Sequence, residues 1–189
     1  MAKIPEKHEY IARRRVARKL SLMAFYQWHI NASEFPEILL YYQQDEDMAA
    51  DLRKADVSYF KALVERAIED TDSLDERIKP FLDRDLSQVG PIEHSVLVLA
   101  TIELQHHMDV GYKTVVNEWV NLCKRFGPDK SHKFINAVLD KLVTQLRAQE
   151  LLDNYGFSLI PLLIVVPIIG FLIPLLYSLL LLDLLRTVQ

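Results

Sequence analysis

Five cationic side chains lie within seven residues near the start of the chain, and they are the clearest candidates for chemistry. They are Arg13, Arg14, Arg15, Arg18 and Lys19. Residues four apart lie on one face of a helix, so Arg14 and Arg18 form one row, and Arg15 and Lys19 form the next. Two adjacent rows of cations can follow successive phosphates of a nucleic acid. Because so much like charge repels itself, the run predicts an anionic partner.

The charged residues of the whole chain are segregated along the sequence. Residues 1–20 carry seven Lys or Arg against two Glu, and residues 113–150 carry seven against four acids. Residues 34–93 carry sixteen acids against seven bases. The net charge of −4 would by itself argue against nucleic-acid binding. A polyanion responds to charge within about 10 Å, the Debye length, so a segregated basic face still favours binding.

The hydrophobic pattern is helical, and only five glycines occur among 189 residues, so we predict an all-α bundle of about six to seven helices. Prolines, alone or after glycine, mark several breaks. The apolar run over residues 96–102 predicts that its helix is the buried centre of the bundle. The expected helices cover residues 12–31, 36–42, a segment capped by Asp56, 71–79, 92–107, 113–125 and 130–149.

The length suits one ordinary domain with a real core. We expect a flexible N-terminus over residues 1–11, one domain over residues 12–150 and a hydrophobic extension over residues 151–189. The only cysteine, Cys123, rules out an intramolecular disulfide and suits a reducing compartment. Residues 1–20 lack the apolar stretch of a secretory signal, so the domain is expected to be cytoplasmic.

Residues 157–182 contain no charged side chain. A helix of about 20 such residues can cross a hydrocarbon core of about 30 Å, although the three prolines of this segment would kink it. Three alternatives remain open. The segment is a C-terminal membrane anchor with Lys141 and Arg147 on the cytoplasmic side, a hydrophobic hairpin broken at Gly170, or an extension without a role in RNA binding.

A series of motifs runs in consistent order from residue 12 to about residue 147. They are Arg14-Arg15-x-x-Arg18 before Ala24-Phe25-Tyr26-Gln27-Trp28, then Gly90-Pro91-Ile92-Glu93, Tyr112-Lys113 with Asn117-Glu118, Lys124-Arg125-Phe126-Gly127, and the segment from Ser131 to Lys141. Together these motifs resemble the NusB family of transcription antitermination factors.

The resemblance implies an all-helical fold that binds the single-stranded boxA element of leader RNA jointly with NusE, a small-subunit ribosomal protein. It also implies a place in the RNA polymerase antitermination complex during rRNA synthesis. The residues that it implies for RNA binding are Arg14, Arg15, Arg18, Ser131, His132, Lys133 and Phe134. Those that it implies for NusE binding are Tyr26 and Glu93.

Each of these positions also has a plain structural interpretation. An arginine-rich stretch is often a solvated helix face. Tyr26 and Trp28 lie on an amphipathic helix and are typical core residues. His132 would suit a helix cap, and Glu93 stabilises a helix N-terminus with or without a partner. In favour of RNA binding, Phe134 and His132 offer planar groups on which unstacked bases can lie.

Two positions depart from the family pattern. Lys130 precedes Ser131 where relatives often have an acid, and its extra positive charge is expected to raise RNA affinity and lower discrimination. His94 follows Glu93 where many relatives have Arg or Lys, which leaves the details of protein docking open.

The sequence contains no catalytic constellation, and we predict that the chain is not an enzyme. Cys123 lacks a pattern of nucleophile and base, so it is predicted to be a buried, inert thiol. Glu103 has helical spacing to His106 and His107, but without further ligands neither a metal nor another cofactor is predicted. No glycine-rich phosphate loop occurs, which excludes the RNA cytosine methyltransferases that join a NusB-like domain to a cofactor-binding domain.

We therefore expect a non-enzymatic RNA-binding adaptor of rRNA transcription. In it, Lys130 and Lys133 join the arginines in supplying positive charge, and Phe134 supplies stacking. The alternative is a membrane-tethered helical adaptor that has kept the fold but docks only proteins, which would show no RNA affinity. The sequence leaves open whether the chain acts as a monomer or as a homodimer.

Overall fold

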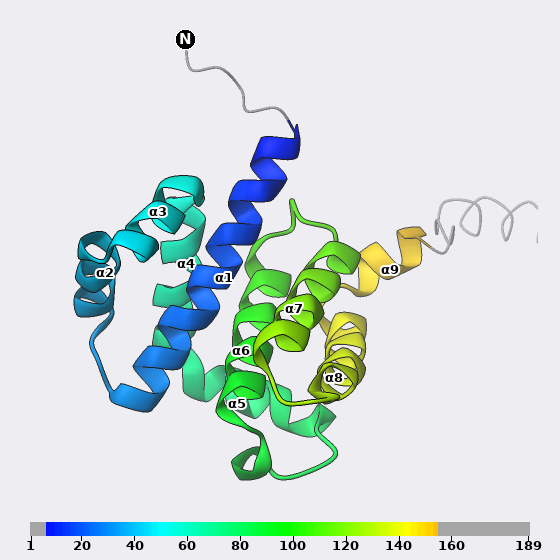
Figure 1. Ribbon diagram of the computed structural model, residues 1–189. Helices are drawn as coiled ribbons and strands as arrows, with labels where there is room; N and C mark the ends of the chain where they lie inside the picture. Colours follow the sequence, from blue (N-terminus) through cyan, green and yellow to red (C-terminus); the bar gives the residue numbers. More distant parts are fainter. Residues whose placement is uncertain (1–6, 155–189) are drawn as a thin grey trace, which may run out of the picture. The chain divides into compact units, whose positions relative to one another are not determined.

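The computed structural model describes residues 7–154, and all regular structure in this range is helical (Figure 1). The chain divides into two units, residues 1–147 and 148–189. The prediction of an all-α fold is confirmed. The described part of the first unit contains eight α-helices and two short 3-10 helices, one α-helix more than the sequence predicted.

The helices of the first unit are α1 (Lys7–Asn31), α2 (Phe35–Gln44), α3 (Glu46–Lys54), α4 (Val57–Glu69), α5 (Thr71–Ile78), the 3-10 helices η1 (Lys79–Phe81) and η2 (Leu86–Gln88), α6 (Pro91–His106), α7 (Tyr112–Phe126) and α8 (Ser131–Leu146). The described part of the second unit contains α9 (Ala148–Asn154). The first helix begins at Lys7, earlier than the predicted start at residue 12.

Helix α6 is the buried centre of the first unit, as predicted. Every residue from 94 to 104 is buried, and the helix contacts α1, α4, α5, α7 and α8. Its start follows from local chemistry, because Pro91 fits the first turn of a helix and the backbone N–H of Gly90 donates to Oε2 of Glu93 at 3.0 Å.

Helix α1 runs between the group α2 to α4 and the group α6 to α8 (Figure 1). The helical pattern of the sequence places Val16, Leu20, Met23 and Gln27 on one face of this helix. Of these four, only Leu20 is fully buried, and the other three are half-buried. The fully buried side is instead built from small and aromatic side chains together with Leu20. Its residues are Ala17, Ser21, Ala24 and Phe25.

Helix α3 was not predicted, because its sequence is rich in acids and has few apolar residues. Its start is nevertheless encoded locally. Asp45 has an extended backbone, and its Oδ1 accepts a hydrogen bond from the backbone N–H of Met48 at 3.0 Å, a typical N-cap. The same residue closes α2, since its N–H donates to the carbonyl of Tyr41. One aspartate therefore ends one helix and begins the next.

The predicted helix over residues 130–149 is interrupted at Arg147. This residue has a non-helical backbone, and its buried guanidinium donates to the carbonyls of Leu104 and His107 at 2.6 and 2.9 Å. These carbonyls lie at the C-terminal end of α6, where a helix leaves acceptors unpaired. One of the three open interpretations of the C-terminal segment made Arg147 a cation flanking a membrane anchor. In the structure Arg147 is 4% exposed and joins α8 to α6.

None of the helices within residues 7–154 is both long and apolar enough to cross a membrane. The uncharged segment 157–182, with its three alternative interpretations, lies outside the described residues, as does most of the N-terminal segment 1–11.

An aromatic cluster joins α2 to α4 and gives a test of the core. Phe60 is fully buried, with ring centroids of Phe35 and Tyr42 at 5.8 and 6.3 Å. We expect Phe60→Ala to lower the free energy of unfolding by about 3–5 kcal/mol, because it leaves a cavity. Leu40→Ala, at an exposed site of α2, should change it by less than about 0.5 kcal/mol. Urea denaturation of both variants would measure this difference, and equal effects would contradict the packing.

Candidate functional site

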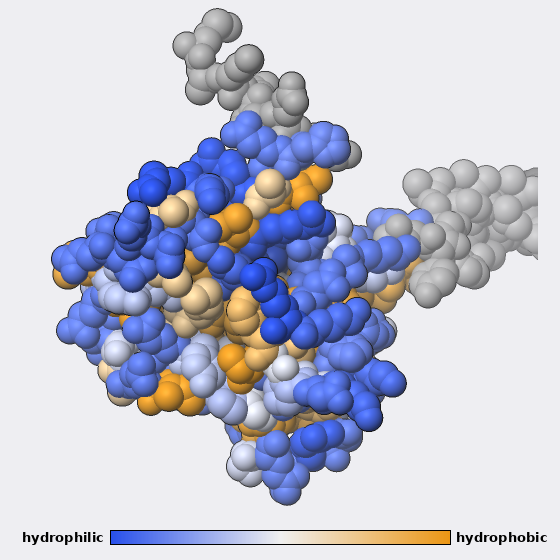
Figure 2. All heavy atoms as spheres, viewed as in Figure 1, coloured by the Kyte–Doolittle hydropathy of each residue, from blue (hydrophilic) through white to orange (hydrophobic). Residues whose placement is uncertain are grey.

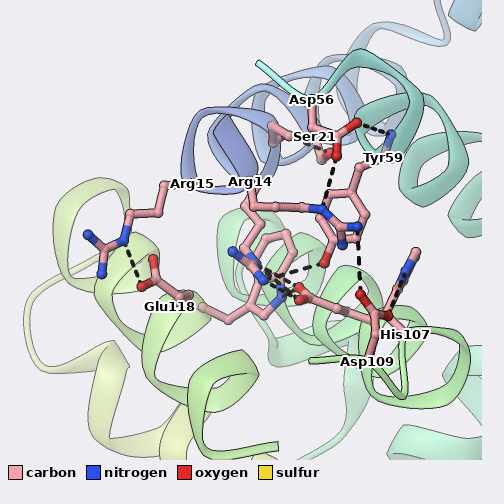
Figure 3. A network of polar contacts seen from close by, with 12 residues as sticks. Arg14, Arg15, Ser21, Asp56, Tyr59, His107, Asp109 and Glu118 are labelled. Carbon is pink, nitrogen blue, oxygen red and sulfur yellow. Dashed lines mark hydrogen bonds and ion pairs between the residues drawn. The ribbon is translucent and has the colours of Figure 1, made fainter. Parts of the chain in front are cut away.

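The arginine side chains of the run point to different sides of α1. Figure 3 shows Arg15 pointing towards Glu118 of α7, whereas Arg14 points the opposite way, towards Asp56 and Asp109. The exposed fractions of the Arg15, Arg14 and Arg18 side chains are 60%, 14% and 3%. The two predicted rows therefore meet different environments, and only one of the three motif arginines is largely exposed.

Arg18 forms a buried ion pair with Glu103 of α6. Its Nε donates to Oε2 at 2.8 Å, and its Nη2 donates to Oε1 at 2.5 Å. Nε1 of Trp119, from α7, donates to the same carboxylate at 2.7 Å. Burial disfavours the charge, but the hydrogen bonds and charge of Glu103 raise the pKa of Arg18 above its ordinary value. Arg18 thus joins three helices and is not available to a ligand at the surface.

Arg14 is clamped between an aromatic ring and a carboxylate. Its guanidinium carbon lies 3.7 Å from the ring centroid of Tyr59, and its Nε donates to Oδ2 of Asp56 at 3.0 Å. Burial alone would raise the pKa of Asp56. The hydrogen bonds from the Ser58 hydroxyl and the Tyr59 backbone N–H, together with Arg14, instead lower it below the ordinary value. Asp56 is also the predicted cap of α4, since Oδ1 accepts from the Tyr59 N–H.

The exposed side of the run faces α7 and α3. Nε of Arg15 donates to Oε1 of Glu118 at 2.8 Å, and Lys19 pairs with Asp51. Arg14 and Arg18 have the carboxylate partners described above, so most of the run is paired within the chain. The anionic partner that the sequence predicted is therefore, to a large extent, the protein's own set of acids.

The turn between α7 and α8 positions the second predicted segment. A Cβ on Gly127 would lie 2.7 Å from the carbonyl oxygen of Cys123 and 2.8 Å from Oγ of Ser131, so only glycine fits here. The buried Ser131 hydroxyl donates to the carbonyl of Pro128 at 2.7 Å and lies 3.1 Å from Sγ of Cys123. Ser131 therefore shapes the turn, while Lys130 adopts a left-handed backbone with φ of 63°.

Cys123 is fully buried, as predicted, and burial raises the pKa of its thiol despite the nearby Ser131 hydroxyl. A protonated, buried thiol is a poor nucleophile. Within residues 7–154, no three or more His, Cys, Asp or Glu side chains converge as a metal site requires.

Cations and one aromatic ring gather at the start of α8. Lys130 and Lys133 are exposed, and His132 and Phe134 are partly exposed. The guanidinium carbon of Arg84 lies 4.5 Å from the centroid of the Phe134 ring. The predicted stacking platform is thus a ring paired with a planar cation from the segment before η2. Nothing in the sequence indicated the contact from Arg84, because this residue lies 50 positions from Phe134 in an acidic stretch.

Tyr26 lines an open groove of about 370 Å³ beside α1, α2 and the end of α7. The groove is mostly apolar and aromatic, and its other lining residues include Tyr41, Tyr42, Ile92 and Phe126. Glu93, the neighbour of Ile92, caps α6 as the plain interpretation expected. Glu93 is half-buried in the first turn of α6.

His94, the departure from the family pattern, is buried against α5. Its Nε2 lies 2.7 Å from Oδ1 of Asp75, and its ring centroid lies 5.0 Å from that of His29. The imidazole is 5% exposed and packs inward. The position after Glu93 therefore adds no exposed cation in this chain.

Figure 2, drawn from the same side as Figure 1, shows that the face over α1 and α7 is mostly hydrophilic with smaller hydrophobic patches between. The fold and the site define a class of protein. It is an all-helical domain whose surface combines exposed cations with a partly exposed aromatic ring, and whose helices α1 and α6 are joined by a buried ion pair. Surfaces of this composition are typical of proteins that bind single-stranded nucleic acid.

Comparison with known proteins is consistent with this class. Residues 15–144 match the model of the NusB family, and the chain belongs to that family. The transcription antitermination protein NusB of Idiomarina loihiensis is 43% identical over 136 residues, which cover 72% of this chain and 95% of that relative. The resemblance inferred from the motifs is confirmed, and with it the prediction that the chain is not an enzyme.

Two solved structures show the same fold. The solution structure of NusB from Aquifex aeolicus is similar with a TM-score of 0.59 at 22% identity, covering 72% of this chain and 90% of that one. A crystal structure of the antitermination factors NusB and NusE in complex with double-stranded RNA matches with a TM-score of 0.55 at 22% identity. The match covers 68% of this chain and 93% of the matched chain.

The buried pair gives a test that separates Arg18 from Arg15. We expect Glu103→Gln to lower the free energy of unfolding by about 3–5 kcal/mol, because it leaves the Arg18 charge buried without its counter-ion. Adding Arg18→Met should recover part of this loss. The control Arg15→Ala removes a pair whose arginine is 60% exposed, and it should cost about 0–1 kcal/mol. Denaturant titration measures all three, and a cost below about 1 kcal/mol for Glu103→Gln would contradict the buried pair.

Three histidines should make the fold less stable in acid. Burial is the largest cause that lowers the pKa of His29, His106 and His107 below the ordinary value of 6.5. The unfolded chain then binds more protons, so their contribution is complete above pH 6.5 and is lost as the pH falls through the folded pKa. We expect His107→Phe, which keeps the ring against Tyr59, to flatten the dependence of unfolding free energy on pH between about 7 and 5. Denaturation at several pH values would show an unchanged slope if the assignment is wrong.

Proposed function

We propose that this chain is an RNA-binding transcription antitermination factor. It binds the single-stranded boxA element of leader RNA together with a NusE-type ribosomal protein, and so promotes rRNA synthesis by RNA polymerase in the cytoplasm. The observation that carries the proposal is the cluster at the start of α8, where exposed lysines adjoin the paired Phe134 and Arg84.

The chemistry of this cluster suits single-stranded RNA. Lys130 and Lys133 supply charge for phosphates, and the loss of bound counter-ions would make affinity fall with salt. Phe134 and Arg84 are both planar, so either can stack against an unpaired base. His132 adds a third planar group beside them. Stacking on planar groups does not distinguish one base from another. A preference for the boxA sequence must therefore come from hydrogen bonds to the edges of the bases.

The roles within the arginine motif differ under this proposal. Arg15 is exposed and presents the free part of its guanidinium to RNA, whereas Arg14 and Arg18 are paired inside the protein. Arg18 and Ser131 act as positioning residues, because one fixes α1 against α6 and the other shapes the turn that presents Lys130 and Lys133.

The apolar groove at Tyr26 supports a protein partner. An aromatic groove of about 370 Å³ beside the carboxylate of Glu93 would accept an apolar side chain next to a basic one. The structural neighbour described as NusB with NusE and RNA gives a precedent for this pair of partners in that complex. Tyr26 and Glu93 are therefore proposed to contact the NusE-type protein.

Fluorescence anisotropy of a labelled boxA RNA, titrated with the full chain with and without NusE, tests the proposal. We expect Phe134→Leu to weaken binding about 5- to 150-fold, because stacking on an aromatic ring contributes about 1–3 kcal/mol per base. Lys133→Ala and Arg15→Ala should each reduce the slope of log affinity against log salt by about 1. NusE should tighten binding in every case.

The matched control is Lys54→Ala, which removes an exposed cation from the end of α3, away from the α8 cluster. It should leave RNA affinity unchanged. Absence of RNA binding with and without NusE would refute the proposal and favour the protein-docking adaptor instead.

A further inference from the structure

A second groove, between α1 and α7, carries an inference that rests on the proposed function. Its volume is about 310 Å³, and Arg15, Lys19, Glu118, Asn121, Leu122 and Arg125 line it. This volume leaves room for one planar base. Among the residues that line this groove, only Arg15 belongs to the RNA-binding residues that the family resemblance implied.

The rim of the groove is cationic and its wall is partly apolar. Arg15 comes from α1, and Arg125 comes from the last turn of α7, so the two guanidinium groups flank the groove from different helices. The guanidinium carbon of Arg125 lies 5.1 Å from the ring centroid of Phe126, which fixes the side chain near the end of α7. Leu122 offers an apolar surface against which the face of a base can pack.

Two side chains in the groove can read the edge of a base. The Asn121 side chain is exposed, and no hydrogen bond within residues 7–154 engages its amide. The Glu118 carboxylate accepts from Arg15 through Oε1, which leaves Oε2 able to accept from a ligand. An amide both donates and accepts, and a carboxylate accepts from an exocyclic amine. The edge that fits has an amino group beside a ring nitrogen.

We propose that this groove binds a single unstacked ribonucleotide whose base carries an exocyclic amino group. The Glu118 carboxylate accepts from that amino group, and the Asn121 amide pairs with the ring nitrogen beside it. Arg125 and the free nitrogens of Arg15 bind the adjoining phosphates. Uracil lacks the amino group, so it would leave the Glu118 carboxylate without a donor.

Anisotropy of the full chain with short homopolymers of adenosine, cytidine and uridine tests this assignment. The wild-type chain should bind the adenosine or cytidine polymer more tightly than the uridine polymer. Asn121→Ala should reduce this preference by about 5- to 150-fold, corresponding to about 1–3 kcal/mol for a paired base edge. The relative affinity of the first two polymers ranks adenine against cytosine at this site.

Two matched controls lie on the same helix outside the groove lining. Asn117→Ala removes an exposed amide, and Lys124→Gln removes an exposed charge next to Arg125. Both should keep the wild-type preference, whereas Arg125→Gln should weaken all three polymers. An unchanged preference in Asn121→Ala, or none in the wild type, would overturn the assignment while RNA binding itself stands. No RNA binding by the wild type would refute the proposed function and this assignment together.

Discussion

The buried ion pair between Arg18 and Glu103 sets the arrangement of the first unit, because it joins α1 to α6, and Trp119 brings α7 to the same carboxylate. A charge so far from water is tolerated only when it is paired and fully hydrogen-bonded. This constraint fixes the rotation of α1 about its axis. It therefore decides which of the other cations in the run face solvent.

Once α1 is fixed in this way, the rest of the charged surface follows. Arg14 turns towards Tyr59 and Asp56, and Arg15 turns towards α7 and remains exposed. Of the three motif arginines only Arg15 stays largely exposed, and the start of α8 adds the exposed Lys130 and Lys133. Much of the positive charge of the arginine run is thus taken up by pairs within the chain.

The sequence predicted much of the fold and the general character of the site. The run over residues 96–102 identified α6 as the centre, because continuous apolar residues can only be buried. The sequence could not show that Arg18 is buried, since its partner Glu103 lies 85 positions away in the chain. For the same reason Arg84 was missed, and the buried contacts of Arg147 were not foreseen. Helix α3 was missed because its start depends on one capping aspartate rather than on an apolar pattern.

The most direct measurement follows the arginine Nε–H signals by NMR while boxA RNA is added to the isotope-labelled chain. Because the pair with Glu103 is buried, the Arg18 signal should exchange slowly with solvent and stay in place when RNA binds. The Arg15 signal should exchange quickly and shift. A shift of Arg18 as large as that of Arg15, or an unmoved Arg15 signal in the RNA complex, would contradict the division of the run into an internal and an RNA-facing part.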